Sequence, residues 1–164
     1  MRSYNFKELE ENDLSEVTKI YNHYVINTSA TFHAHPLSTD EMRELVFFES
    51  AKYKTYAILD GHIMVGYLII TQHKKREAYD GTAEVTIYLK PEYTGKGIGS
   101  PAIKFAEEVA GKYSIHVLVA TISGNNDKSI KLFEKNGFVK CAHYKEVGKK
   151  FGQWLDVVAY QKIL

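Results

Sequence analysis

Residues 92–105 read EYTGKGIGSPAIKF and lie between a β-rich segment and an apolar run with helical spacing. Glycines occupy alternate positions here, so several backbone amides lack a neighbouring Cβ atom and are accessible to an anion. The following helix is expected to have Ser100 as its cap and Pro101 as its first residue, with its positive dipole end facing the loop. The spacing suits a phosphate-binding turn, or a turn that only reverses the chain. The three glycines are Gly95, Gly97 and Gly99.

Two common nucleotide-binding motifs do not match this loop. A dinucleotide fingerprint counted from Gly95 requires a sixth-position glycine, where the chain has Ser100. A P-loop requires a hydroxyl residue directly after its lysine, whereas Lys96 is followed by Gly97. The loop therefore matches neither of these nucleotide-binding motifs, and it binds a ligand of another class or none.

Composition limits the possible functions of the chain. Its 164 residues are 45% hydrophobic and 25% charged, with a net charge of +1, which predicts one globular domain over residues 1–164. A net charge of +1 is far from the basic excess typical of a nucleic-acid-binding protein, so no nucleic-acid partner is expected. The longest apolar stretch, residues 63–70, is too short to span a membrane, and no apolar signal core is found near the N-terminus.

Cysteine and histidine usage indicates a reduced compartment and no metal. Cys141 is the only cysteine, which excludes an internal disulfide and predicts a cytoplasmic protein. His33 and His35 lie close together but have no third ligand nearby, so a zinc site is not expected.

The first half of the chain predicts two helices and four strands. A strand in YNFKEL precedes a helix opened by Asp13 and Glu16 as a capping box and reaching about Asn27. A second capped helix is expected in HPLSTDEMRELVFFESAKY. The pair Asp60-Gly61 divides TYAILDGHIMVGYLIIT into a hairpin, and a further strand follows in GTAEVTIYLKPEY.

The second half predicts two more helices and three strands. The helix after the glycine loop is expected over about residues 100–113, before a β-branched strand in IHVLVATIS. Another helix opens at Asn125-Asn126 and stops at Asn136-Gly137. Strands in FVKCAHY and QWLDVVAYQKIL close the chain. This order of elements is mixed α/β.

Several motifs resemble one enzyme superfamily. GKGIGS after a strand, with NNDKSIKLFEKNGF further on, resembles the GNAT superfamily of N-acetyltransferases, in which this loop holds the pyrophosphate of acetyl-CoA. IYNHYVINTSATF, TAEVTIYL and VGKKFGQWLDVVAYQ resemble the phosphinothricin acetyltransferase group. The resemblance implies a single-domain α+β acyl-CoA N-acyltransferase fold, with a mixed, mostly antiparallel central sheet flanked by helices. It also implies acetyl-CoA as cosubstrate, no metal, and a homodimer with Trp154 and Asp156 at its surface.

The implied reaction is acetyl transfer to the α-amine of a small amino-acid-like acceptor, of the phosphinothricin, methionine sulfone or methionine sulfoximine type. Glu84 matches the glutamate that serves the group as general base, although a strand glutamate can also be merely solvated. A half-buried carboxylate is a stronger base than a solvated one, which suits this role. Alternatives are a non-catalytic acyl-CoA-binding module, an interaction protein of the same fold, or an enzyme acting on a polyamine or protein N-terminus.

The resemblance assigns cofactor contacts to three segments. Asn126 and Ser129 also suit simple helix capping, and Lys96 also suits a solvated loop position. A backbone amide of the strand containing residues 85–89 is expected to bind the thioester oxygen. The expected cofactor-binding residues are Ile87, Tyr88, Leu89, Gly95, Lys96, Gly97, Ile98, Gly99, Ser100, Asn126, Ser129 and Phe133.

Acceptor contacts are implied for Phe32, Arg76 and Glu84. Arg76 is expected to hold the acceptor carboxylate in a bidentate fork, and its alternative is a solvated turn in HKKR. Phe32 is expected as a wall of the acceptor site, and its alternative is a core position.

Two positions depart from the superfamily pattern: Thr94 stands where arginine or glutamine is usual, and Phe133 where a proton-donating tyrosine is frequent. The thiolate must therefore leave unassisted or take a proton from water or a hydroxyl such as Ser129.

Overall fold

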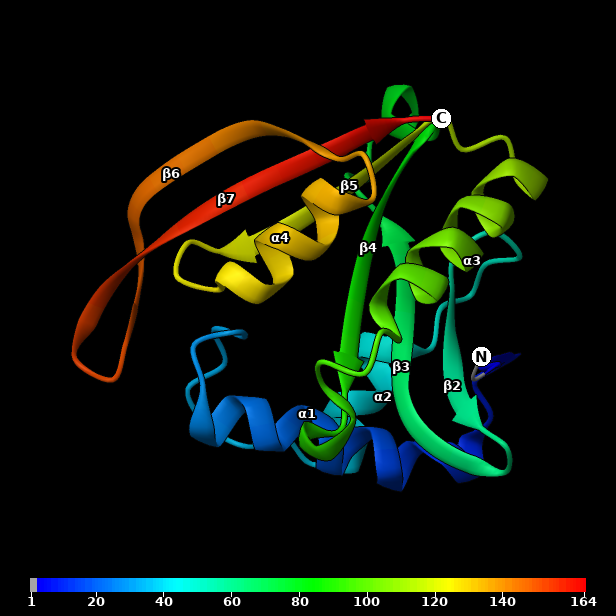
Figure 1. The fold of residues 1–164 in the computed structure, drawn as a ribbon, viewed down its shortest axis with the longest axis horizontal. Helices are drawn as coiled ribbons and strands as arrows, with labels where there is room; N and C mark the ends of the chain where they lie inside the picture. Colours follow the sequence, from blue (N-terminus) through cyan, green and yellow to red (C-terminus); the bar gives the residue numbers. More distant parts are fainter. Residues whose placement is uncertain (1–2) are drawn as a thin grey trace.

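The structure is a computed structural model that describes residues 3–164 (Figure 1). Its strands are β1 (Asn5–Glu8), β2 (Lys54–Asp60), β3 (Ile63–Gln72), β4 (Thr82–Leu89), β5 (Val117–Ser123), β6 (Val139–Lys150) and β7 (Gln153–Ile163). Its α-helices are α1 (Leu14–Asn27), α2 (Thr39–Val46), α3 (Gly99–Lys112) and α4 (Asp127–Lys135). Short 3₁₀ helices lie at η1 (Glu11–Asp13), η2 (Glu77–Tyr79) and η3 (Pro91–Tyr93). The expected mixed α/β class with helices flanking a sheet is confirmed.

The strands form one sheet in the order β1-β2-β3-β4-β5-β7-β6. Every neighbouring pair is antiparallel except β4 and β5, which are parallel. Pairing between β4 and β5 covers only Thr82–Glu84 against residues 117–119. Beyond Glu84 the two strands diverge, as Figure 1 shows, and the sheet opens into a fork.

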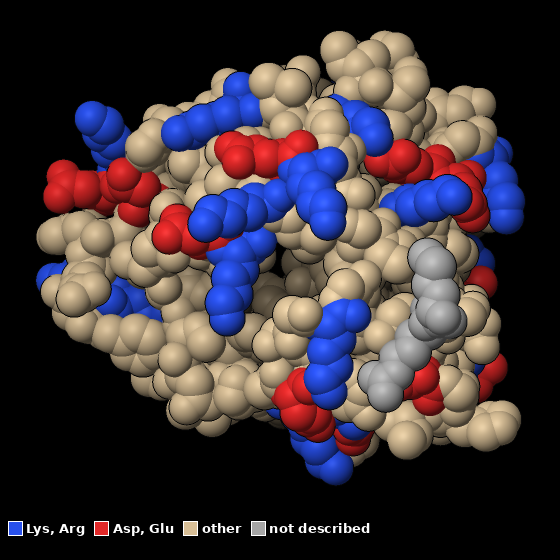
Figure 2. Space-filling view, viewed as in Figure 1, with Lys and Arg blue, Asp and Glu red and all other residues tan. Residues whose placement is uncertain are grey.

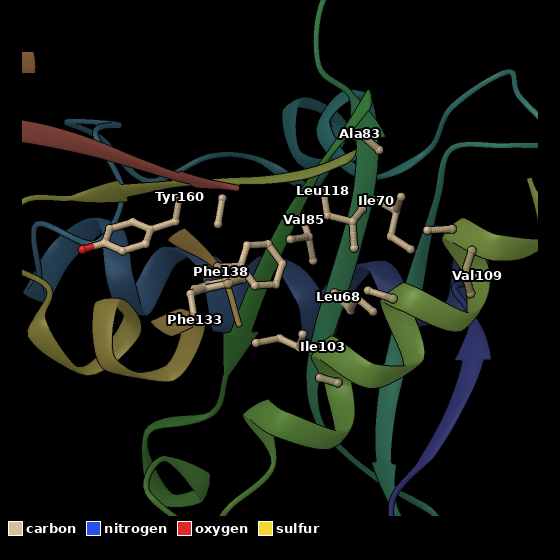
Figure 3. Packing of buried hydrophobic residues seen from close by; sticks show 14 of the residues in the cluster. Leu68, Ile70, Ala83, Val85, Ile103, Val109, Leu118, Phe133, Phe138 and Tyr160 are labelled. Carbon is tan, nitrogen blue, oxygen red and sulfur yellow. The ribbon is translucent and has the colours of Figure 1, made fainter. Parts of the chain in front are cut away.

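Each face of the sheet carries its own hydrophobic core. Because side chains alternate along a strand, Val85 faces α3 and α4, whereas Tyr88 faces α1 and α2. In Figure 3, Ile103 and Val109 of α3 point toward Leu68 and Ile70 of the sheet. The fork therefore opens between two packed layers that keep its strands in place.

The first helix begins differently from the sequence prediction. Asp13 and Glu16 do not form the expected capping box. Instead, the Asp13 carboxylate accepts a hydrogen bond from the Glu10 amide at 3.0 Å, which caps η1, and α1 follows at Leu14. The second helix follows its prediction, because Ser38 Oγ accepts from the Glu41 amide and Glu41 Oε2 accepts from the Ser38 amide.

The expected role of Ser100 as a helix cap is wrong. Helix α3 begins at Gly99, so Ser100 is its second residue and Pro101 its third. Gly99 packs closely on α4, where an added Cβ atom would lie 2.5 Å from Leu132 Cδ2. Ser100 Oγ instead accepts a hydrogen bond from Asn136 Nδ2 at 3.0 Å, which joins the start of α3 to the end of α4.

The closing hairpin is longer than the sequence prediction. Strand β6 continues past FVKCAHY to Lys150, with an irregular register between Tyr144 and Gly148. Lys150 is buried, and its ammonium donates to the carbonyl oxygens of Thr28 and Thr31 at 2.7 and 2.8 Å. These bonds tie the hairpin to the loop between α1 and α2. Within residues 3–164, no helix combines the length and apolarity needed to cross a membrane.

Two glycine substitutions should change stability in opposite directions. In Gly66→Ala the new Cβ atom would lie 2.4 Å from the Tyr88 carbonyl oxygen. Backbone cannot yield cheaply, so we expect a loss of about 1–3 kcal/mol in the free energy of unfolding. Gly111→Ala, on α3 with open space around it, should gain about 0.5–1 kcal/mol through helix propensity. Urea unfolding of both variants measures this, and equal effects would contradict the packing argument.

Candidate functional site

An open cavity of about 400 Å³ occupies the fork. Both strands of the fork, the loop between β4 and α3, and helix α4 line it. The face of the molecule in Figure 2 is hollowed near its centre, and Lys and Arg side chains gather around the hollow. Lys128 and Lys135 belong to the cavity lining and supply positive charge at its edge.

Backbone groups of β4 face this cavity. The Lys90 amide donates to the Val65 carbonyl of β3. Because backbone groups alternate along an antiparallel ladder, the amides and carbonyls of Val85 and Ile87 point away from β3 and toward the fork. The Leu89 carbonyl points the same way and accepts a hydrogen bond from the Tyr24 hydroxyl. The Val85 carbonyl and the amide and carbonyl of Ile87 lie beyond the last β4–β5 pair and are therefore available to a bound molecule.

The glycine loop has a conformation that favours glycine. Gly95 and Gly97 have φ angles of +73° and +81°, in the left-handed region that side chains rarely adopt. Both line the cavity, as does Ile98, and the N-terminus of α3 directs its positive dipole end at the same space. Thr94 also lines the cavity and donates its hydroxyl to the Pro91 carbonyl at 2.8 Å. The loop is thus suited to hold an anion against free amides.

The first turns of α4 form another wall. The Asn126 side chain accepts from the Ser129 amide at 3.3 Å and caps the helix, and both residues line the cavity. Phe133 is also in the lining but stacks edge-on with Phe138 at 5.0 Å between ring centroids. Lys96 lies outside the lining, exposed, with its ammonium 4.8 Å from the Tyr93 ring centroid.

Glu84 stands where the fork begins. Its neighbours Val85 and Thr86 line the cavity, although Glu84 itself does not. The Glu84 side chain is 31% exposed, and its Oε1 lies 2.9 Å from Nδ1 of His73. The carboxylate thus has one oxygen engaged by an imidazole beside the point where the two strands separate.

The other two predicted acceptor residues lie outside the cavity lining. Arg76 is exposed, and its guanidinium carbon is 5.5 Å from the Tyr79 ring centroid. Phe32 is 41% exposed, which excludes the core alternative. Its ring packs on β6 so closely that a Cβ atom at Gly148 would lie 2.2 Å from Phe32 Cε2.

Sequence reasoning missed an aromatic cluster beside β4. Tyr88 contacts Tyr21, Tyr24 and Tyr67, each with ring centroids about 5.3–5.5 Å away. The Tyr21 hydroxyl hydrogen bonds with Thr31 Oγ1 at 2.6 Å. Burial raises the pKa of Tyr88, so its phenol stays protonated. Tyr21 and Tyr24 stand three residues apart on α1, the one sequence signal for a shared face.

A sheet that opens beside a glycine loop and a helix N-terminus is the arrangement expected of an acyl-CoA-dependent transferase. The family model described as Acetyltransferase (GNAT) domain matches residues 6–159. The chain belongs to the GNAT acetyltransferase family.

Several named acetyltransferases resemble the chain over most of its length. Phosphinothricin N-acetyltransferase of Streptomyces coelicolor is 32% identical, over 94% of this chain and 92% of the relative. L-methionine sulfoximine/L-methionine sulfone acetyltransferase of Salmonella typhimurium is 31% identical, over 91% and 88% of the two chains. A solved phosphinothricin acetyltransferase from Sinorhizobium meliloti, in complex with AcCoA, has a TM-score of 0.91 and 30% identity, covering 100% of this chain and 89% of that one.

Gly97→Val tests the loop. The substitution places a branched side chain at a positive φ angle and over the amides of the cavity, so the Michaelis constant for acetyl-CoA should rise at least about tenfold. Gly61→Val is the matched control, since Gly61 has a φ of +62° and open space but lies in the β2–β3 turn. Steady-state kinetics and thermal unfolding of both variants separate binding from strain. Unchanged acetyl-CoA affinity in Gly97→Val would contradict the assignment of the loop.

Proposed function

We propose that the protein transfers the acetyl group of acetyl-CoA to the α-amine of a small amino-acid-like acceptor, of the phosphinothricin, methionine sulfone or methionine sulfoximine type. The observation that carries the proposal is Glu84 at the opening of a strand fork whose cavity is lined by the glycine loop. The names of the similar enzymes from Streptomyces coelicolor and Salmonella typhimurium support this acceptor class. Residues 1–164 would act as one N-acetyltransferase domain.

The cavity walls suit the parts of acetyl-CoA. Amides of the glycine loop and the α3 N-terminus would hold the pyrophosphate, with charge added by Lys128 and Lys135. Asn126 and Ser129 would contact the pantetheine region. The Val85 carbonyl and the amide and carbonyl of Ile87, which lie beyond the β4–β5 pairing, would bind the extended arm as a further strand does.

Glu84 is proposed as the general base. Its carboxylate would accept a proton from the acceptor ammonium, directly or through a water, and the free amine would attack the thioester carbon. A β4 amide would then donate to the oxyanion, a contribution worth roughly 3 kcal/mol in comparable acyl-transfer sites. Phe133 carries no proton to donate, so as the C–S bond breaks the sulfur leaves as thiolate or takes a proton from water or Ser129, while the new amide nitrogen loses its extra proton to water.

Arg76 is proposed to bind the acceptor carboxylate. The exposed guanidinium stacks on Tyr79, whose ring contacts His73 edge-on at 5.8 Å, and His73 contacts Glu84. This chain of contacts supports a place for Arg76 on the acceptor side, beside the base. Phe32 would form an apolar wall of the same site.

A homodimer and a cytoplasmic location belong to the same proposal. The β6–β7 hairpin carries large apolar side chains that are more than half exposed, including Tyr144, Phe151 and Trp154. Apolar groups gathered on one projecting element support an interface with a second copy. Asp156, at the same hairpin, accepts from the Glu146 amide and pairs with His143 within the chain. The single cysteine, Cys141, supports a reducing compartment.

An acceptor panel tests the substrate class. Acetyl-CoA turnover would be measured with phosphinothricin, methionine sulfone, methionine sulfoximine, a polyamine and a peptide with a free N-terminus. The three amino-acid-like compounds should be the best acceptors. Preference for the polyamine or the peptide would overturn the acceptor class, and turnover with none of them would favour a binding module.

Glu84→Gln tests the base. Turnover should fall by about 10² to 10⁴, the usual share of general-base catalysis, while acetyl-CoA affinity stays nearly unchanged. Glu108→Gln, an exposed position on α3, removes the same charge away from the site and should leave turnover unaltered. A Glu84→Gln enzyme with near-wild-type turnover would assign the proton transfer to another group.

Arg76→Lys tests the carboxylate clamp. Lysine keeps the charge but loses the planar fork, so the Michaelis constant for the acceptor should rise more than turnover falls. Lys75→Ala, a neighbouring exposed charge, should leave both parameters near wild type. If the wild-type enzyme acetylates amino-acid amides as readily as the acids, Arg76 does not select the carboxylate.

A further inference from the structure

His73 and Glu84 meet across two neighbouring strands. In the β3–β4 register Thr71 stands opposite Glu84 and Gln72 opposite Ala83, so His73 follows β3 on the same face as Glu84 and diagonal to it. Nδ1 of His73 lies 2.9 Å from Oε1 of Glu84. The two side chains are 23% and 31% exposed, so this contact is partly shielded from water.

The imidazole is held on a second side. The Tyr79 ring lies edge-on to it at 5.8 Å, and Tyr79 is itself fixed by the bond from its amide to the Arg76 carbonyl at 3.0 Å. The ring of His73 therefore lies between a carboxylate and an aromatic edge. Within residues 3–164, His73 is the one residue that hydrogen bonds to the Glu84 carboxylate.

We propose that His73 is a positioning residue for the base. This inference rests on the proposed function of Glu84. An ionised carboxylate only accepts hydrogen bonds, so the hydrogen of this contact lies on Nδ1 of His73. Donation to Oε1 fixes the carboxylate and leaves Oε2 for the acceptor ammonium, at the point where β4 and β5 separate.

Three substitutions at His73 separate positioning from packing. His73→Asn places its amide nitrogen as many bonds from the backbone as Nδ1, so it keeps the donor. His73→Gln carries the nitrogen one bond further out, and His73→Phe keeps a ring against Tyr79 without any donor. Turnover should fall about 10- to 100-fold in His73→Phe and His73→Gln, the scale expected for a misplaced reacting group. His73→Asn should stay within about threefold of wild type.

The Michaelis constant for acetyl-CoA and the thermal unfolding midpoint give the structural controls. Both should change little in His73→Asn, and the acetyl-CoA constant should stay within about twofold in all three variants. If turnover in the three variants follows unfolding temperature instead of donor geometry, His73 only supports the fold and the proposal is wrong.

A double variant separates this inference from the proposed function. Because His73 acts through Glu84, adding His73→Phe to Glu84→Gln should slow the enzyme no further. A full additional loss in the double variant would overturn the positioning role. If Glu84→Gln alone retains turnover, the proposed base fails, whereas a slow Glu84→Gln with a fully active His73→Phe refutes only the inference about His73.

Discussion

The separation of β4 from β5 after Glu84 is the constraint on which the rest of the structure depends. Up to that residue the strands pair, and beyond it the Val85 carbonyl and the peptide groups of Ile87 face an open cavity. Unpaired backbone groups are costly when buried, so this edge persists only where water or a ligand can reach it. The packed cores on both faces stabilise the opened sheet, because α3 and α4 cover one side and α1 and α2 the other.

Helix α3, which the glycine loop joins to β4, is also fixed in place by the backbone of the loop and by packing on α4. Positive φ angles at Gly95 and Gly97 turn the chain so that α3 begins beside the cavity, and Gly99 lets α3 approach Leu132 of α4. These glycines thus serve the turn and the packing of α3 on α4, and the proposed anion site uses the same loop. Their spacing is short and local, so the turn itself can be predicted from the sequence, whereas its binding of an anion stays a prediction.

Local signals predicted most elements, and long-range contacts explain the failures. The Ser38–Glu41 capping box depends on residues three positions apart, so its pattern is visible in the sequence. Ser100 is of a residue type that favours helix caps, yet α3 begins at Gly99, which packs closely on α4, and Ser100 instead contacts Asn136. The fork depends on strand register, and no residue pattern in β4 predicts where its pairing with β5 ends.

The two halves of the candidate site also differ in whether local segments or distant contacts build them. The proposed cofactor half is lined mainly by β4, the glycine loop and α4, each of which is a continuous stretch of the sequence. The proposed acceptor half is assembled from distant segments: Phe32 packs on Gly148, and Lys150 binds carbonyl oxygens in the loop that carries Phe32. A change in the β6–β7 hairpin therefore reaches the acceptor wall without touching the glycine loop. If the two proposed halves hold the donor and the acceptor, this separation would let a family keep one acyl donor while its members diverge in the amine they acetylate.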